Sequence, residues 1–155
     1  MTEQFSCQLE DEAATLKLGA ALAAGVAAGR VLTLSGDLGA GKTTLVRGML
    51  RALGYPGRVK SPSYALVELY RVSSLNFYHF DFYRFANRSE WLDSGFREYF
   101  NPDSVCVVEW PERAEGLLAE PDLEVRLELA GSGRRATLIA HSAAGRDWLS
   151  AASLR

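Results

Sequence analysis

The chain has 155 residues, of which 48% are hydrophobic and 23% charged, as in an ordinary globular domain rather than a disordered chain. Its 17 Lys and Arg residues and 19 Asp and Glu residues leave a net charge of −2, which argues against a module that grips nucleic acid through bulk positive charge. Lysine is rare in this chain, so each position is informative: Lys17, Lys42 and Lys60. We predict one domain over residues 1–155.

The cysteines and the N-terminal segment indicate the compartment. Cys7 and Cys106 lie far apart and have no metal-binding spacing, so we expect reduced, packed thiols, although the sequence alone leaves a disulfide open. Residues 1–12 are acidic, unlike the positive start of a signal peptide. The longest apolar stretch, residues 19–29, is shorter than the about 20 residues needed to span a bilayer. We therefore expect a cytoplasmic protein without membrane association.

The first third of the chain predicts four elements in the order strand, helix, strand, helix. Residues 3–8 are typical of a short strand, and apolar residues recur four apart over residues 10–28, which favours a helix. The apolar run 31–35 predicts a buried strand that leads into a glycine-rich loop. Residues 41–53 then predict a second helix, which ends before a glycine and a proline.

The middle of the chain is rich in strand-forming residues. Tyrosine, valine, leucine and phenylalanine fill residues 64–72 and 75–82, and two serines between them indicate a hairpin. Residues 88–100 favour short helical pieces. The apolar run 105–108 predicts a buried strand, and a proline begins a short helix over residues 111–118.

The last third predicts a hairpin and a closing helix. Residues 123–130 and 135–141 read as strands joined by a glycine-containing turn, and residues 143–152 as a helix. The fold class is therefore α/β. We expect a single domain in which several antiparallel strands are added to a parallel core.

The glycine-rich loop matches the P-loop pattern G-x-x-x-x-G-K-[ST], with Gly36 at its start and Gly41, Lys42 and Thr43 at its end. Glycines let successive backbone N–H groups point at a phosphate chain, and the following helix directs its positive end to the same anion. Lys42 supplies a charge for the β- and γ-phosphates, and the Thr43 hydroxyl supplies a ligand for Mg²⁺. The alternative is an ordinary glycine-rich turn with a solvated lysine. It does not explain why the motif stands between a predicted buried strand and a predicted helix.

A P-loop needs an acidic partner at the end of a neighbouring strand, and two carboxylates have that position. Glu109 follows the apolar run 105–108, and Asp81 ends the strand 75–82. Strand alternation puts His79 and Asp81 on one face. Structural alternatives stay open: an ion pair for Asp81, a helix cap for Glu109, a packed core histidine for His79 and packing for Trp110, although Trp110 is also placed to shield the site.

Residues 60–66 lie between the P-loop helix and Asp81, where P-loop switches carry a loop that orders around the γ-phosphate. Pro62 fixes the turn, and Ser61 or Ser63 supplies a hydroxyl to a phosphate or a water molecule. A plain connecting turn is the alternative reading of the same composition.

Four segments together resemble the TsaE family, also called YjeE or YdiB, the small bacterial ATPases of tRNA threonylcarbamoyladenosine biosynthesis. They are residues 36–44, residues 61–64, the His-x-Asp-x-Tyr-Arg pattern at 79–84 and residues 109–112. The P-loop alone occurs in many families, whereas the other three segments are specific. One departure is Ser63, where the family usually has threonine; the hydroxyl is kept on a less restricted side chain.

The resemblance implies a single P-loop domain with a mixed, mostly parallel core sheet, added antiparallel strands and helices on both faces. It also implies ATP hydrolysis with Mg²⁺, carried out with the proteins TsaD and TsaB, so that tRNA adenosine 37 is reached indirectly through the complex. It implies Thr43 and Glu109 as Mg²⁺ ligands, Lys42 at the γ-phosphate and Asp81 as the residue that orients water or acts as base. The nucleotide-binding residues that it implies are Gly39, Ala40, Gly41, Lys42, Thr43, Thr44, Ser63, Glu109 and Arg134.

Two other functions fit a P-loop of this size. A small-molecule kinase requires an acceptor pocket and a mobile lid with arginine, for which residues 84–97 supply Arg84, Arg88 and Arg97 without a recognisable lid pattern. A non-hydrolytic adaptor, in which nucleotide binding orders residues 60–66 for docking, has the same sequence features as a slow ATPase.

Overall fold

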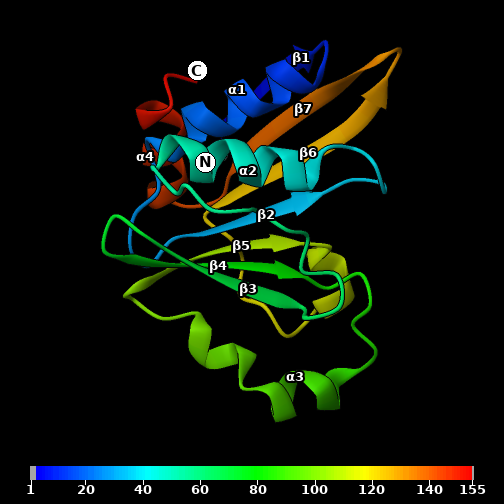
Figure 1. Cartoon of the computed structure of the whole chain (residues 1–155), viewed down its shortest axis with the longest axis vertical. Coiled ribbons are helices and arrows are strands. Elements are labelled where there is room, and N and C mark those ends of the chain that lie inside the picture. Colours follow the sequence, from blue (N-terminus) through cyan, green and yellow to red (C-terminus); the bar gives the residue numbers. More distant parts are fainter. Residues whose placement is uncertain (1–2, 155) are drawn as a thin grey trace.

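The apolar and alternating segments of the sequence form seven strands that all join one sheet, in a computed structural model that describes residues 3–154 (Figure 1). The strands are β1 (Glu3–Leu9), β2 (Val31–Ser35), β3 (Val67–Val72), β4 (Leu75–Asp81), β5 (Ser104–Glu109), β6 (Leu123–Ala130) and β7 (Gly133–Ala140). The helices are α1 (Glu12–Ala23), α2 (Lys42–Ala52), α3 (Arg88–Ser94) and α4 (Ala143–Ala151), with 3₁₀ turns η1 (Phe96–Tyr99) and η2 (Pro111–Ala114).

The strand order β1-β7-β6-β2-β5-β4-β3 confirms the predicted sheet. The four central strands β6, β2, β5 and β4 are parallel, and β2 lies in the middle with β5 and β6 as its neighbours. Strand β3 adds to one side by an antiparallel hairpin, and β7 and β1 add to the other. Because the parallel strands end at one edge, the loops after β2, β4 and β5 converge there, which is where open α/β sheets bind ligands.

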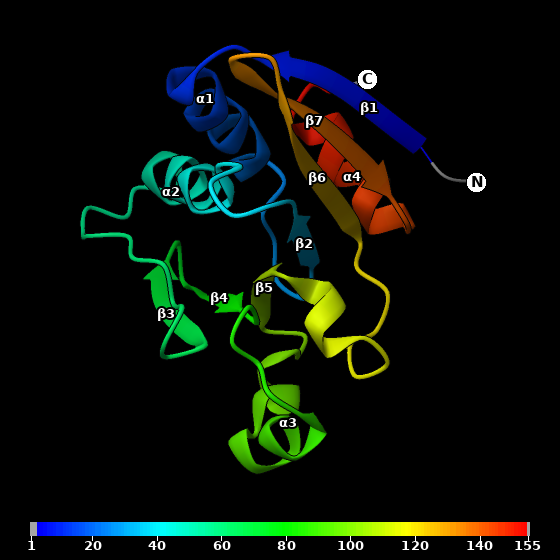
Figure 2. The same ribbon diagram turned by 90° about the vertical axis from the view of Figure 1, so that its right-hand side faces the viewer.

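Helices cover both faces of this sheet, as the family resemblance implies (Figure 2). Helices α1, α2 and α4 bury their apolar sides against one face, in a core that includes Leu45, Met49 and Trp148. Helix α3 and the turns η1 and η2 cover β4 and β5 on the other face with an aromatic cluster around Phe80. Helices α1 and α2 lie side by side on that face, and the P-loop leads from β2 into α2 (Figure 2).

Three predicted boundaries differ from the structure. The first helix ends at Ala23 rather than at residue 28, because the Leu22 carbonyl accepts the indole N–H of Trp148 at 2.8 Å and the Val26 N–H donates to Ala23 instead. Strand β3 begins at Val67 rather than at residue 64, because residues 62–66 close a turn in which the Leu66 N–H donates to the Pro62 carbonyl. The helix predicted over residues 111–118 is only the short turn η2.

Both cysteines are free thiols, as expected, with Cys7 half-buried on β1 and Cys106 buried on β5. Burial raises the pKa of the Cys106 thiol to about 12, since the apolar interior disfavours the thiolate. Over residues 3–154, the helices are too short or too polar to cross a membrane.

Candidate functional site

The P-loop connects β2 to α2, and its glycines are required by backbone conformation and by space. Gly36, Gly39 and Gly41 have φ angles of 145°, 80° and 102°, in the region that side chains disfavour. A Cβ atom at Gly36 would also lie 2.3 Å from the Leu127 carbonyl oxygen. The loop therefore passes close to β6 and turns into the first residue of α2, Lys42, with its backbone free to curl around an anion.

Lys42 is folded onto its own loop. Its Nζ atom donates to the carbonyl oxygens of Gly36 and Asp37 and lies 3.8 Å from the centroid of the Trp110 ring. The side chain is only 5% exposed, and this burial lowers its pKa from the ordinary lysine value, opposed by nearby carboxylates of which Glu109 is the strongest. The two carbonyl groups and the Trp110 ring therefore stabilise the Lys42 ammonium group in the place of a phosphate chain.

The two predicted cation ligands are adjacent. The Thr43 hydroxyl, at the start of α2, donates to Oε2 of Glu109 at 3.1 Å, and Glu109 stands at the end of β5. The same Oε2 atom lies 2.5 Å from Nε2 of His79 on β4. Glu109 is therefore held from two sides, by the P-loop helix and by the neighbouring strand, and it is only 3% exposed.

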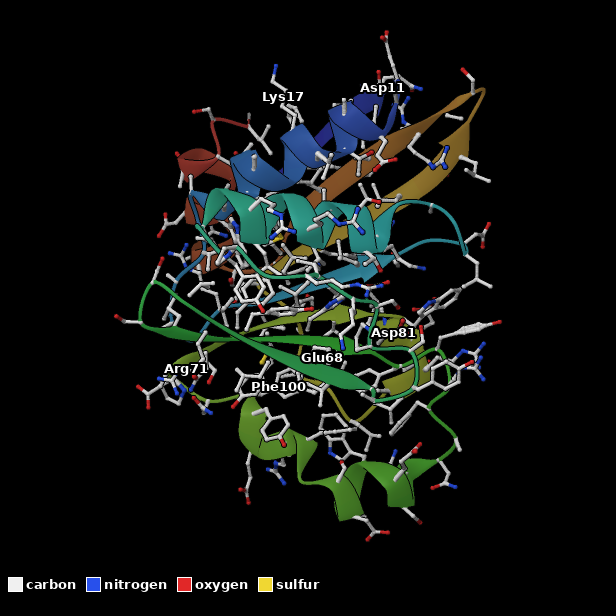
Figure 3. All side chains as sticks on the ribbon, viewed as in Figure 1. Asp11, Lys17, Glu68, Arg71, Asp81 and Phe100 are labelled. Atoms are coloured by element: carbon white, nitrogen blue, oxygen red, sulfur yellow. The ribbon has the colours of Figure 1, made fainter. Side chains whose placement is uncertain are left out.

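Asp81 ends β4 directly beside Glu109 in the parallel register, and Figure 3 shows it at the edge of the sheet where the P-loop enters α2. Its Oδ1 atom accepts the Tyr83 N–H at 2.9 Å. Its Oδ2 atom lies 3.4 and 3.5 Å from the hydroxyls of Ser61 and Ser63, which are themselves 2.8 Å apart. The carboxylate thus links the end of β4 to the loop 60–66 by long, weak hydrogen bonds that a ligand can readily exchange.

Arg134, on β7, supports the P-loop from the outside. Its Nε atom donates to the Ala40 carbonyl at 3.1 Å and its Nη2 atom to the Gly39 carbonyl at 2.9 Å. These two bonds tie the loop to the β6–β7 hairpin, so that its carbonyl groups face the arginine and are turned from the anion side. The Ala40 methyl group is buried in the core and contributes packing.

Aromatic residues form the remaining wall. Trp110 follows Glu109 with a φ angle of 57°, a left-handed conformation that is costly for a tryptophan, and its ring contacts Tyr83 edge-on. Beyond it, the Arg84 guanidinium stacks on the ring of Tyr64, whose side chain is 84% exposed. The wall therefore joins the strand ends to the loop 60–66.

These groups surround one cleft of about 420 Å³, lined by Lys42, Thr43, Ser63, Asp81 and Glu109 together with P-loop glycines. A second cavity of about 310 Å³ continues on the other side of the P-loop, where Thr44 and Arg134 line it. All the residues predicted from the sequence thus lie on or beside the P-loop, Ala40 and Arg134 outside the cleft itself.

The family model "Threonylcarbamoyl adenosine biosynthesis protein TsaE" matches residues 9–137. The chain belongs to the TsaE family. The tRNA threonylcarbamoyladenosine biosynthesis protein TsaE of Haemophilus influenzae is 48% identical over 77% of this chain and 76% of its own, and that of Bacillus subtilis is 41% identical over 81% and 77%. The solved structure of Bacillus subtilis YdiB superposes with a TM-score of 0.84 at 31% identity, covering 99% of this chain and 96% of that one.

Membership of the TsaE family places the chain in tRNA threonylcarbamoyladenosine biosynthesis. Sequence reasoning missed three contacts of the site: the pair between His79 and Glu109, the seat of Lys42 on Trp110 and the stacking of Arg84 on Tyr64. The alternation of β4 put His79 on the face of Asp81, and this was the one indication of its place. The other two contacts depend on loop conformations that no spacing rule encodes.

Proposed function

We propose that this chain binds ATP with Mg²⁺ and hydrolyses it slowly, as the nucleotide-dependent component of tRNA threonylcarbamoyladenosine synthesis at adenosine 37. The observation that carries the proposal is the contact of the Thr43 hydroxyl with the Glu109 carboxylate at the start of the P-loop helix, with Lys42 and Asp81 on the same cleft. This is the arrangement in which P-loop enzymes pair a hydroxyl and an acidic residue beside the β- and γ-phosphates.

The residues present fit a magnesium ion. Thr43 and Glu109 offer oxygen ligands whose 3.1 Å separation is near the about 2.9 Å edge of an octahedron with bonds of about 2.05 Å. Among the described residues, no group of three or more His, Cys, Asp or Glu side chains is arranged to hold a metal. The remaining ligands would therefore be phosphate oxygens and water, as Mg²⁺ prefers, and the ion would neutralise phosphate charge.

The proposed reaction is in-line attack of water on the γ-phosphorus. The water oxygen bonds to phosphorus, the bond from phosphorus to the β–γ bridging oxygen breaks, and ADP leaves with the electron pair. Asp81 orients the water and accepts its proton, or passes it to solvent, while Lys42 leaves Trp110 to bind the γ-phosphate. The loop 60–66 exchanges its bonds with Asp81 for contacts with the phosphate through Ser63.

The proposal includes partner proteins that raise the rate of ATP hydrolysis. Two basic side chains line the cleft. Lys42 contacts the ring of Trp110, and Arg84 stacks on the ring of the exposed Tyr64, so Arg84 is not positioned as an arginine finger. We therefore expect slow intrinsic turnover that rises with TsaD and TsaB, which also bring the tRNA. A cytoplasmic location follows from this role as part of the proposal.

Among the arginines of residues 84–97 that the kinase alternative requires, only Arg84 lines the phosphate cleft, where its guanidinium stacks on the ring of Tyr64. Arg88 and Arg97 line a groove on the opposite face of the sheet, beside α3, and do not reach the phosphate cleft. The adaptor alternative shares every feature of the site and differs only in whether hydrolysis matters.

The test is phosphate release by the purified chain, alone and with TsaD–TsaB, together with tRNA modification by the reconstituted set. We expect Lys42→Ala to abolish release and Asp81→Asn to lower it at least about 100-fold while ATP binding is kept. Lys17→Ala, which removes an exposed lysine on α1 outside the cleft, is the control. Turnover that depends on an added metabolite favours a kinase, and full tRNA modification by Asp81→Asn favours the adaptor.

A further inference from the structure

His79 is a buried histidine with an unusual set of partners. It lies on β4 with no exposed surface, two residues before Asp81 and on the same face of the strand. Its Nε2 atom is 2.5 Å from Oε2 of Glu109, and that oxygen also accepts the Thr43 hydroxyl. His79 does not line the phosphate cleft, so it touches the site only through Glu109.

The surroundings of the ring assign its proton. A carboxylate oxygen accepts hydrogen bonds, so Nε2 carries the hydrogen that is donated to Glu109. The other nitrogen, Nδ1, is buried and has no hydrogen-bond partner among the described residues. The hydrogen bond of the ring to the site is therefore the one that Nε2 makes with Glu109. Buried unpaired atoms are rare and require a compensating role.

The contact with Glu109 supplies that role. Without His79, the Glu109 side chain would be fixed at its carboxylate only by the Thr43 hydroxyl, and it would be free to turn about its own bonds at the strand end. Donation from Nε2 fixes Oε2 beside Thr43. The hydrogen bonds from Thr43 and His79 use both lone pairs of Oε2, and Oε1 is left without a bond to the rest of the site. Outer partners of this kind orient the groups that bind metal ions.

We propose that His79 is a positioning residue that holds the Glu109 carboxylate in register with Thr43 for the divalent cation of the bound nucleotide. The inference rests on the proposed function, since it names the residue that prepares that cation site. It predicts that loss of the Nε2 donor weakens cation binding in the presence of nucleotide, and leaves nucleotide binding without cation unchanged, because the phosphate-binding backbone and Lys42 remain in place.

The test compares His79→Leu, which removes the donor and keeps an apolar side chain, with His79→Gln, whose amide nitrogen reaches a similar position. Mn²⁺ binding to the ADP-saturated protein is measured by electron paramagnetic resonance, and ADP binding is measured in EDTA. We expect His79→Leu to weaken Mn²⁺ binding about 10- to 100-fold, His79→Gln to restore most of it, and both variants to bind ADP in EDTA within about twofold of the wild type. His141→Leu, which removes the other histidine of the chain, is the control.

Mn²⁺ affinity of His79→Leu within about twofold of the wild type, or an equal loss in the glutamine variant, overturns the proposal. Should the leucine variant fail to fold, nitrogen-15 spectra of the wild-type imidazoles decide, since the chain has two histidines and His141→Leu assigns them. We expect a hydrogen on Nε2 of His79, and a shift of that resonance when Mg²⁺ joins the ADP complex. No shift overturns the proposal, whereas absence of ADP binding by the wild type refutes the proposed function itself.

Discussion

The replacement of Arg134 by alanine tests how the P-loop is held. In the structure the Arg134 guanidinium donates to the carbonyl oxygens of Gly39 and Ala40, at 2.9 and 3.1 Å, and to that of Gly133 at 3.1 Å. The first two bonds join the loop to β7. Their loss leaves the loop free to sample conformations in which its N–H groups no longer converge, so that anion binding must first restore the present conformation.

The magnitude follows from the bonds. Hydrogen bonds from a charged donor contribute about 1.5–3 kcal/mol each, and the partial exposure of Arg134 argues for the lower end. Two bonds to the loop then correspond to about 3 kcal/mol, of which only the part coupled to loop order appears in binding. We therefore expect Arg134→Ala to weaken ADP binding about 10- to 100-fold, equal to about 1.4–2.8 kcal/mol.

The assay is calorimetric titration with ADP and, separately, with pyrophosphate. Because the argument acts through the phosphate-binding backbone, both ligands should lose affinity by the same factor. Arg135→Ala is the matched control, since it removes the same charge from the next residue of β7, where the side chain is exposed. Unchanged affinity in Arg134→Ala, or an equal loss in Arg135→Ala, refutes the reasoning. A loss for ADP alone indicates instead that Arg134 contacts the nucleoside.

Two further predictions concern stability and the buried thiol. Gly48→Ala on α2 should lower the melting temperature by about 2–8 °C. The new Cβ atom would lie 2.4 Å from the Leu16 carbonyl oxygen of α1, and relieving this clash costs about 1–3 kcal/mol, which exceeds the helix-propensity gain of alanine. A raised melting temperature contradicts this. In a Cys7→Ser background, Cys106 should resist thiol reagents at pH 8 until denaturant is added. Because the pKa of Cys106 is higher in the folded state, its contribution to stability should be full below pH 9 and should be lost as the pH rises from 9 to about 12. Rapid labelling of the native protein at pH 8 would contradict the burial of Cys106.

Much of the fold was predictable because its determinants are local. Buried parallel strands read as unbroken apolar runs, and hairpins carry their turns in the sequence, so β2, β5 and the β6–β7 pair lie within a residue or two of prediction. One error, the end of the first helix, lies where a distant residue decides. The Leu22 carbonyl in the last turn of α1 accepts the indole N–H of Trp148, 126 positions later in the chain, and no property of residues 10–28 predicts this contact.

The candidate site divides in the same way. The P-loop spacing is a local property, because consecutive residues must curl around one anion, so Lys42 and Thr43 were identified from the sequence alone. The choice between Asp81 and Glu109 as partner of Thr43 was not local. The parallel register sets the two carboxylates side by side, but only the position of α2 over β5 brings the Thr43 hydroxyl to Glu109 and leaves Asp81 facing the loop 60–66.

The sequence by itself therefore determined the motif, the order of elements and the polar face of β4, since each depends on residues close together in the chain. The tertiary structure decided which groups meet: His79 with Glu109, Lys42 with Trp110, and Arg134 with the outside of the P-loop. These contacts join residues from different strands and loops, and their distances are fixed by the register and packing of the whole sheet, which no single segment encodes.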